Sequence, residues 1–172
     1  VAYLTATSTT ATSTFAGGLD LTSSTGMGLN FGSNTLFYQN NQRFLTSSTT
    51  AAGNLSFGYE AAPNINENGG LYSTYLGYQA GFTATSSRYN TGTGYQSLYS
   101  IVRGSGLYGD QNTANGHRSL YLNTTGYQNS AFGADALRSN TTGYQNSALG
   151  VQSLYSNTSG YNNIALGKNT LY

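Results

Sequence analysis

The acidic residues of this chain are scattered rather than clustered. Five carboxylates occur in 172 residues: Asp20, Glu60, Glu67, Asp110 and Asp135. Glu60 and Glu67 flank one short segment and could together bind a cation such as Ca²⁺, although a solvated loop is the simpler interpretation. Asp110 and Asp135 fall at different positions of the sequence repeat described below, so repetition does not pair them like the carboxylates of a glycosidase.

The only histidine, His117, lies beside Arg118. This position is typical of an exposed turn, although three copies meeting on the axis of a trimer could bind a metal or an anion. Serines are abundant, but no G-x-S-x-G motif occurs, and one histidine cannot serve several catalytic triads. GTGYQS and GSGLYG lack the strand and helix that flank a dinucleotide-binding loop. We predict no enzymatic activity, no cofactor and no metal.

Asparagines begin N-x-[ST] triplets at one recurring position. They are Asn123, Asn140 and Asn157, with Asn54 as a further triplet. Glycosylation along one edge of a secreted protein is one interpretation. The preference of asparagine for turns explains the same triplets without modification, and we favour it.

The composition limits the classes of protein and of partner. Charged residues make up 6%, against about 25% in typical soluble domains. The net charge of +1 indicates neither nucleic acid nor an anionic membrane surface as a partner. No apolar run reaches the roughly 18 residues of a membrane helix, so no membrane insertion is expected. The start at Val1, without a signal-type segment, suggests a processed chain or a piece of a longer one.

A repeat of 17 residues organises the chain. Gly116, Gly133, Gly150 and Gly167 keep this period, and a second series of glycines, Gly109, Gly126, Gly143 and Gly160, keeps it too. The unit reads about G-Y-Q-N-S-A-L-G-x-x-S-L-Y-S-N-T-T, and looser copies extend upstream to FGSNTLF at 31–37. The unit contains two short β-like blocks, NSALG and SLYSN, separated by turn residues. The glycines are expected at positive φ or where backbones approach closely.

These features predict an all-β fold, a parallel β-roll or β-helix solenoid with coils of about 17 residues. About eight coils are expected over 31–172, preceded at 1–30 by Thr/Gly-rich leader strands or a stalk.

Three columns of the repeat are candidate functional or core ladders. A core ladder is expected from Leu98, Leu120, Leu137, Leu154 and Leu171. The next residue in most copies gives an interface or stacking ladder of Tyr99, Tyr121, Tyr155 and Tyr172. Tyr127, Tyr144 and Tyr161 follow the second glycine and form a candidate surface-contact ladder, either stacking on sugar rings or holding the coils together.

A thin coil is not expected to bury leucines on one side and this many aromatic rings on the other. An exposed aromatic ladder would be an association surface. We therefore expect a homotrimer whose three rolls share an axial core.

The segment NTTGYQNSALGVQSLYSNTSGYNNIALGKNTLY resembles repeats of phage tail fibres and bacterial surface fibres that end in endosialidase-type chaperone domains. It is also similar in logic to the head repeats of trimeric autotransporter adhesins, in which a small-apolar-Gly motif marks each turn of a parallel β-roll. The resemblance covers roughly residues 31–172. It implies a trimeric extracellular fibre on a cell surface or a virion.

The sequence thus predicts a structural or adhesive fibre segment that attaches through many weak contacts. Two other classes remain open. One is a carbohydrate-binding or carbohydrate-cleaving module, if the insertions at 59–70 and 99–109 converge with Asp110 and Arg103. The other is a self-assembling extracellular filament, whose only partner is the chain itself.

Overall fold

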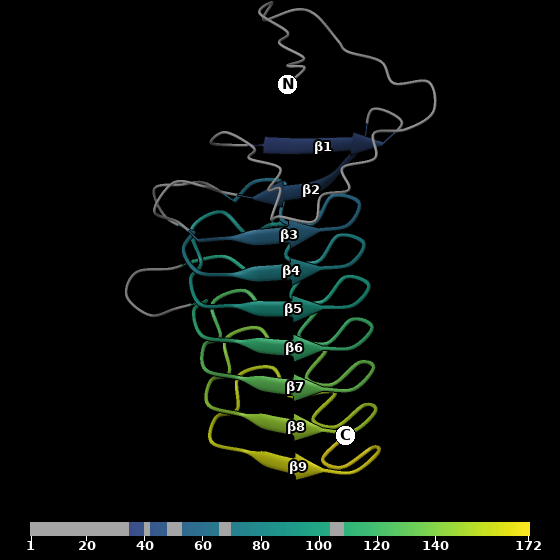
Figure 1. The fold of residues 1–172 in the computed structure, drawn as a ribbon. Coiled ribbons are helices and arrows are strands. Elements are labelled where there is room, and N and C mark those ends of the chain that lie inside the picture. The colour runs from purple at the N-terminus through teal and green to yellow at the C-terminus, as the bar shows by residue number, and fades with distance from the viewer. Residues whose placement is uncertain (1–34, 40–41, 48–52, 66–69, 104–108) are drawn as a thin grey trace, which may run out of the picture. The chain divides into compact units, whose positions relative to one another are not determined.

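The computed structural model describes residues 35–39, 42–47, 53–65, 70–103 and 109–172. The leader expected at 1–30 therefore lies outside the described residues. The described part is all-β and repetitive, with one short strand per repeat (Figure 1).

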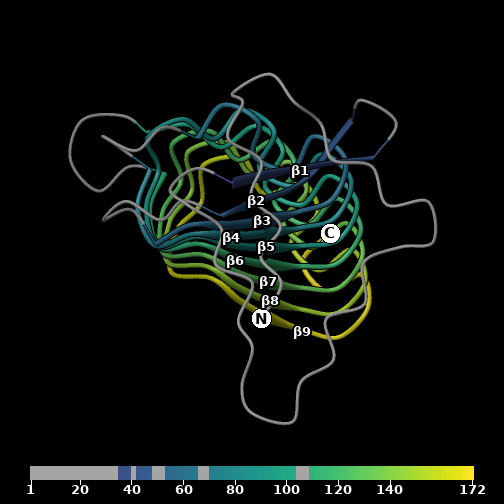
Figure 2. The same cartoon turned by 45° about the horizontal axis from the view of Figure 1, so that its top comes forward.

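Seven short strands stack in parallel and define the solenoid. They are β3 (Leu55–Phe57), β4 (Thr74–Leu76), β5 (Thr91–Thr93), β6 (Thr113–Asn115), β7 (Ser130–Phe132), β8 (Ser147–Leu149) and β9 (Ile164–Leu166). Each pairs with the next in register, so that Ala131 lies between Ala114 and Ala148. After every repeat the chain returns to the same side of the solenoid, where the strands stack (Figure 2). This confirms a parallel β-solenoid, with about six turns.

The first expected copy is not a coil. β1 (Thr35–Gln39) and β2 (Gln42–Ser47) pair antiparallel, and β2 pairs antiparallel with β3. The prediction that 31–37 begins the stack was therefore wrong. The apolar residues of QRFLTS follow β1 after two residues, a separation typical of a tight antiparallel hairpin. This hairpin occupies the edge of β3 that a preceding coil would use.

The second β-like block is not a strand either. The leucine of SLYSN has a left-handed backbone in each of these coils, with φ of 50 to 51° from Leu98 to Leu171. Turn hydrogen bonds flank it, such as Asn123 N–H to the Leu120 carbonyl at 3.2 Å. The Leu120 N–H still donates to Ala136 in the next coil at 3.0 Å, so the turns are cross-linked like the strands. Positive φ is uncommon for leucine, and a β-propensity argument therefore missed it.

The two glycine series meet different needs. Gly133 has a φ of 132°, and a Cβ there would lie 2.5 Å from the Gly150 carbonyl oxygen. Gly143 lies where a Cβ would overlap the Gly160 carbonyl and the Asn140 side chain. Positive φ and close backbone approach thus occur together in the first series, whereas Gly126 and Gly143 of the second series show close approach without positive φ.

Each coil encloses its own core. Leu98, Leu120 and Leu137 are fully buried and Leu154 nearly so, packed with the alanines of the strands. Leu171 departs from the expected core ladder with 58% exposure, because no coil of the structure lies beyond it. Since a single chain buries its leucines, a core shared among three chains is not needed to cover them.

Two ladders of asparagine amides run through the interior. In the first, Asn129 Oδ1 accepts from the backbone N–H of Asn146 at 3.0 Å and from its side-chain amide at 3.1 Å, while Asn129 Nδ2 donates to the Gly143 carbonyl at 2.8 Å. In the second, Asn140 Nδ2 donates to Asn123 Oδ1 at 2.7 Å, and Asn157 repeats the contact with Asn140 at 2.8 Å. These bonds satisfy polar groups that would otherwise be costly to bury.

Candidate functional surfaces

The ladder of Tyr127, Tyr144 and Tyr161 is the most regular aromatic feature. Successive ring centroids lie 4.9 Å apart, and the ring planes differ by 1° and 2°. Tyr161 is exposed, and the two rings before it are half-buried. Each of the three tyrosines directly follows a glycine of the second series. The close packing of that glycine fixes the position of the tyrosine backbone.

This stacking determines what the ladder can contact. The faces of Tyr144 are covered by its two neighbours, so a sugar could not stack on them. Tyr161 stacks on Tyr144 with one face, and its other face carries no stacked ring among the described residues. The ladder instead presents ring edges and phenolic hydroxyls at a regular spacing.

The expected stacking ladder contains an arginine that sequence reasoning missed. Tyr99 stacks on Tyr121 at 5.1 Å and Tyr155 on Tyr172 at 5.0 Å. Between the two pairs, the guanidinium carbon of Arg138 lies 5.6 Å from the Tyr121 ring and 5.5 Å from the Tyr155 ring. Arg138 stands in the same column of the repeat and replaces a ring by a planar cation, a favourable cation–π arrangement.

A third ladder ends at the single histidine. Tyr59, Tyr78 and Tyr95 stack at 5.1 Å, and His117 stacks on Tyr95 at 5.3 Å. His117 is thus exposed in a turn but continues an aromatic column. The signal was present in the sequence, because each of the four residues directly follows a glycine at the equivalent position of its repeat: Gly58, Gly77, Gly94 and Gly116.

A polar column runs beside this third ladder. Gln79 donates to Glu60 at 2.8 Å, Gln96 donates to Gln79 at 2.9 Å, and Arg118 Nε donates to Gln96 at 3.2 Å. Glu60 is therefore the terminal acceptor of this series of side-chain hydrogen bonds. Glu67, its expected partner in a cation site, lies outside the described residues.

Asp110 and Asp135 are held apart in separate ion pairs. Asp110 is buried, accepts the backbone N–H of Arg88 at 2.8 Å and lies 3.6 Å from Arg103 Nε. Burial raises the pKa of the Asp110 carboxyl, and the Arg88 N–H and the Arg103 charge oppose that shift. Asp135 pairs with Arg138 at 3.3 Å. The insertion residues 66–69 and 104–108, needed for the expected pocket, lie outside the described residues.

The asparagines of the N-x-[ST] triplets face inward. Asn123 and Asn140 are fully buried, and Asn54 nearly so. The Asn140 amide nitrogen, where a glycan would be attached, donates to both Asn123 and the Gly143 carbonyl. The folded chain therefore uses these amides in the stack.

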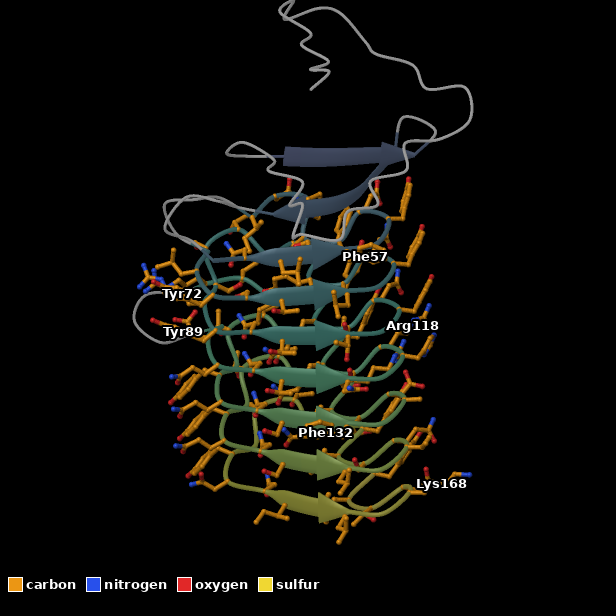
Figure 3. The ribbon with its side chains drawn as sticks, in the orientation of Figure 1. Phe57, Tyr72, Tyr89, Arg118, Phe132 and Lys168 are labelled. Atoms are coloured by element: carbon orange, nitrogen blue, oxygen red, sulfur yellow. The ribbon has the colours of Figure 1, made fainter. Side chains whose placement is uncertain are left out.

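The outward face of the sheet carries apolar side chains at its ends. Leu55, Phe57 and Leu76 project near β3 and β4, whereas Phe132, Leu149, Ile164 and Leu166 project from β7 to β9. The second group lines a hollow of about 320 Å³ together with Ser130 and Ser147. Figure 3 shows Phe57 and Phe132 on the strands, away from Tyr72 and Tyr89 on one side and Arg118 and Lys168 on the other. The outward apolar face is defined here as Phe132, Leu149, Ile164 and Leu166.

Within the described ranges, no three histidine, cysteine or acidic residues gather closely enough to bind a metal ion. No helix in that part of the chain is long and apolar enough to cross a membrane. The chain matched no family model, no curated protein and no solved structure in the three comparisons.

Proposed function

We propose that this chain is a rigid structural segment of an extracellular fibre, on a cell surface or a virion, which assembles as a homotrimer and attaches through repeated weak contacts. The observation that carries the proposal is the continuity of the side-chain ladders. Aromatic rings of one coil stack on those of the next, and side-chain amides and backbone groups form hydrogen bonds between the same coils. Such a stack resists bending and presents identical groups at equal intervals, which favours multivalent attachment.

The outward apolar face supports the homotrimer. Leu149 is 53% exposed and Phe132 41% exposed on neighbouring strands, which is unusual for a surface that stays in water. Because each chain encloses its own core, the three chains would meet through these outer faces. The contact would be one of flat sheets, with the coils of each chain remaining complete.

Sedimentation of the purified chain tests the assembly. A trimer is expected at micromolar concentration, and Phe132→Asp with Leu149→Asp should shift it to monomer while the far-UV circular dichroism is retained. Val151→Asp is the matched control, because Val151 is also exposed and apolar but lies in a turn outside the strands. A wild-type chain that stays monomeric would exclude the homotrimer.

A glycan array tests the adhesive part of the proposal separately. The hydroxyl edges of Tyr127, Tyr144 and Tyr161 are the groups expected to bond to sugar hydroxyls. Binding that weakens for Tyr144→Phe, which keeps the stack but removes a hydroxyl, supports attachment through this ladder. A trimer that binds no glycan would indicate a scaffold only.

A further inference from the structure

The composition concentrates oxidation chemistry on tyrosine. The chain has 16 tyrosines but no cysteine, no tryptophan and one methionine. Cysteine, tryptophan and methionine are the side chains that usually compete with tyrosine for oxidants. Met27 is the single methionine and is distant in sequence from the tyrosine ladders. An oxidising equivalent that reaches the solenoid is therefore expected to reside on a phenol.

The ladder of Tyr127, Tyr144 and Tyr161 places three phenols in a geometry suited to coupling. The rings are parallel within 2° and their centroids are 4.9 Å apart. The rings are stacked, so the faces that carry the Cε carbons next to the hydroxyl are turned toward the neighbouring ring. Two phenoxyl radicals combine face to face at those carbons before their hydrogens are lost.

We propose that the ladder of Tyr127, Tyr144 and Tyr161 is a site of dityrosine cross-linking, which joins consecutive coils covalently under one-electron oxidation. Each of two tyrosines gives one electron to the oxidant and its phenolic proton to water. A Cε–Cε bond then forms, and the two Cε hydrogens move to the oxygens as the rings regain aromaticity. The pair loses two electrons and two protons in total, and a peroxide or persulfate accepts the electrons.

The other ladders are less suited to this reaction. Tyr99 and Tyr121 are inclined by 27°, and Tyr72 and Tyr89 are 5.5 Å apart. Arg138 interrupts the column between Tyr121 and Tyr155. Tyr78 has a tyrosine on each face, but its rings are inclined by 13° and 7°. Tyr144 combines two tyrosine neighbours with nearly parallel planes.

Light-driven oxidation with a ruthenium tris-bipyridyl complex and persulfate tests the proposal on the intact chain. The expected products keep the size of the uncross-linked chain, show dityrosine fluorescence, and are lighter by two hydrogens per link. Peptide mapping should join Tyr127 to Tyr144 or Tyr144 to Tyr161. Cross-linked protein should also unfold at a higher denaturant concentration, because the links close loops between coils.

Two comparisons make the result specific. Tyr144→Phe keeps a ring in the ladder and should abolish both links, whereas Tyr95→Phe, in the middle of another ladder, should leave them. The same oxidation in denaturant should give other pairs, since the stack is lost. The proposal is overturned if the native chain yields no link at these tyrosines, if its links survive Tyr144→Phe, or if the folded and unfolded chains give the same pairs.

Discussion

The ring of Tyr75 occupies the space that a side chain on Gly81 would need. A Cβ on Gly81 would overlap the ring carbons, and a Cβ on Gly92 in the next coil would lie 3.2 Å from Tyr75 Cδ1. In the coils from β6 to β9 the strand position of Tyr75 holds an alanine and the turn position of Gly81 holds a leucine, as in Ala131 and Leu137. The strands on either side of Tyr75 hold Ser56 and Gly92 at this position. The coil of β4 thus has a large residue on the strand, Tyr75, and a small residue in the turn, Gly81, where the coils from β6 to β9 have a small strand residue and a large turn residue.

This exchange predicts strong coupling between the two positions. Tyr75→Ala should cost about 3 kcal/mol of unfolding free energy through a cavity, and Gly81→Leu about 1–3 kcal/mol through overlap with the ring. The double variant restores the pairing of the coils from β6 to β9 and should lose at least ~1 kcal/mol less than the sum. Chemical denaturation of the four proteins measures the cycle. Tyr75→Ala combined with the exposed Gln128→Ala should be additive, and additivity for the first pair would contradict the exchange.

Gly133→Ala should strongly destabilise the stack. The substitution adds a methyl group 2.5 Å from the Gly150 carbonyl oxygen, at a φ of 132°. We expect a loss of more than about 2 kcal/mol, beyond the strain of a positive φ alone. Gly167→Ala is the matched control, because its φ is 115° but its nearest neighbour is the Thr170 hydroxyl at 3.1 Å. Equal losses at the two positions in thermal or chemical denaturation would rule out backbone contact as the cause.

Asn129→Ala should be costly although it removes a polar residue. The change removes the acceptor of the buried Asn146 backbone N–H, while the Gly143 carbonyl keeps the Asn140 amide as a donor. Buried groups left without hydrogen bonds cost about 1–3 kcal/mol each. Gln128→Ala, next to it and exposed, should change the unfolding free energy by less than about 0.5 kcal/mol. Hydrogen exchange of the coil amides gives a second measure, and unchanged protection in Asn129→Ala would show that the ladder is not stabilising.

The buried Asp110 predicts a pH dependence of defined sign. Its pKa is raised in the folded state, so between its unfolded and folded pKa values the folded chain binds more protons. The unfolding free energy should therefore fall as pH rises from about 4 through the raised pKa, then stay level. Asp110→Asn should remove this decrease, and Asp135→Asn should leave it in place. A wild-type stability that increases over the same pH interval would refute the assignment.

Sequence reasoning found what is periodic and missed what depends on backbone angle. The spacing of the glycines was enough to predict parallel coils, and the alanine and leucine columns marked the interior. The strand assigned to SLYSN failed because neither spacing nor propensity reveals that Leu120 has a φ of 50°. The expectation at 31–37 failed because a sequence copy of the motif can still pair antiparallel when a β-forming segment follows it.

Two members of the aromatic ladders were not recognised from the sequence, because neither is a tyrosine or a phenylalanine. Arg138 and His117 occupy aromatic columns, but His117 was considered only for a turn or a metal or anion site, and Arg138 was not singled out. Their planarity, which lets them stack, becomes evident only when the column is followed through every coil. For the asparagine triplets, turn preference was favoured over glycosylation, and the structure buries the side chains of Asn123 and Asn140.

The asparagine ladder keeps its geometry across coils of unequal length. Asn112 N–H donates to Asn90 Oδ1 at 2.8 Å over 22 residues, and Asn129 N–H donates to Asn112 Oδ1 at 3.1 Å over 17. The five additional residues of the longer repeat (22 against 17) therefore leave the ladder contact unchanged. A gene that gains or loses whole units keeps every column in register, and so does an insertion that falls in a loop between the columns. Evolution can thus adjust the reach of the stack and the loops along its side independently.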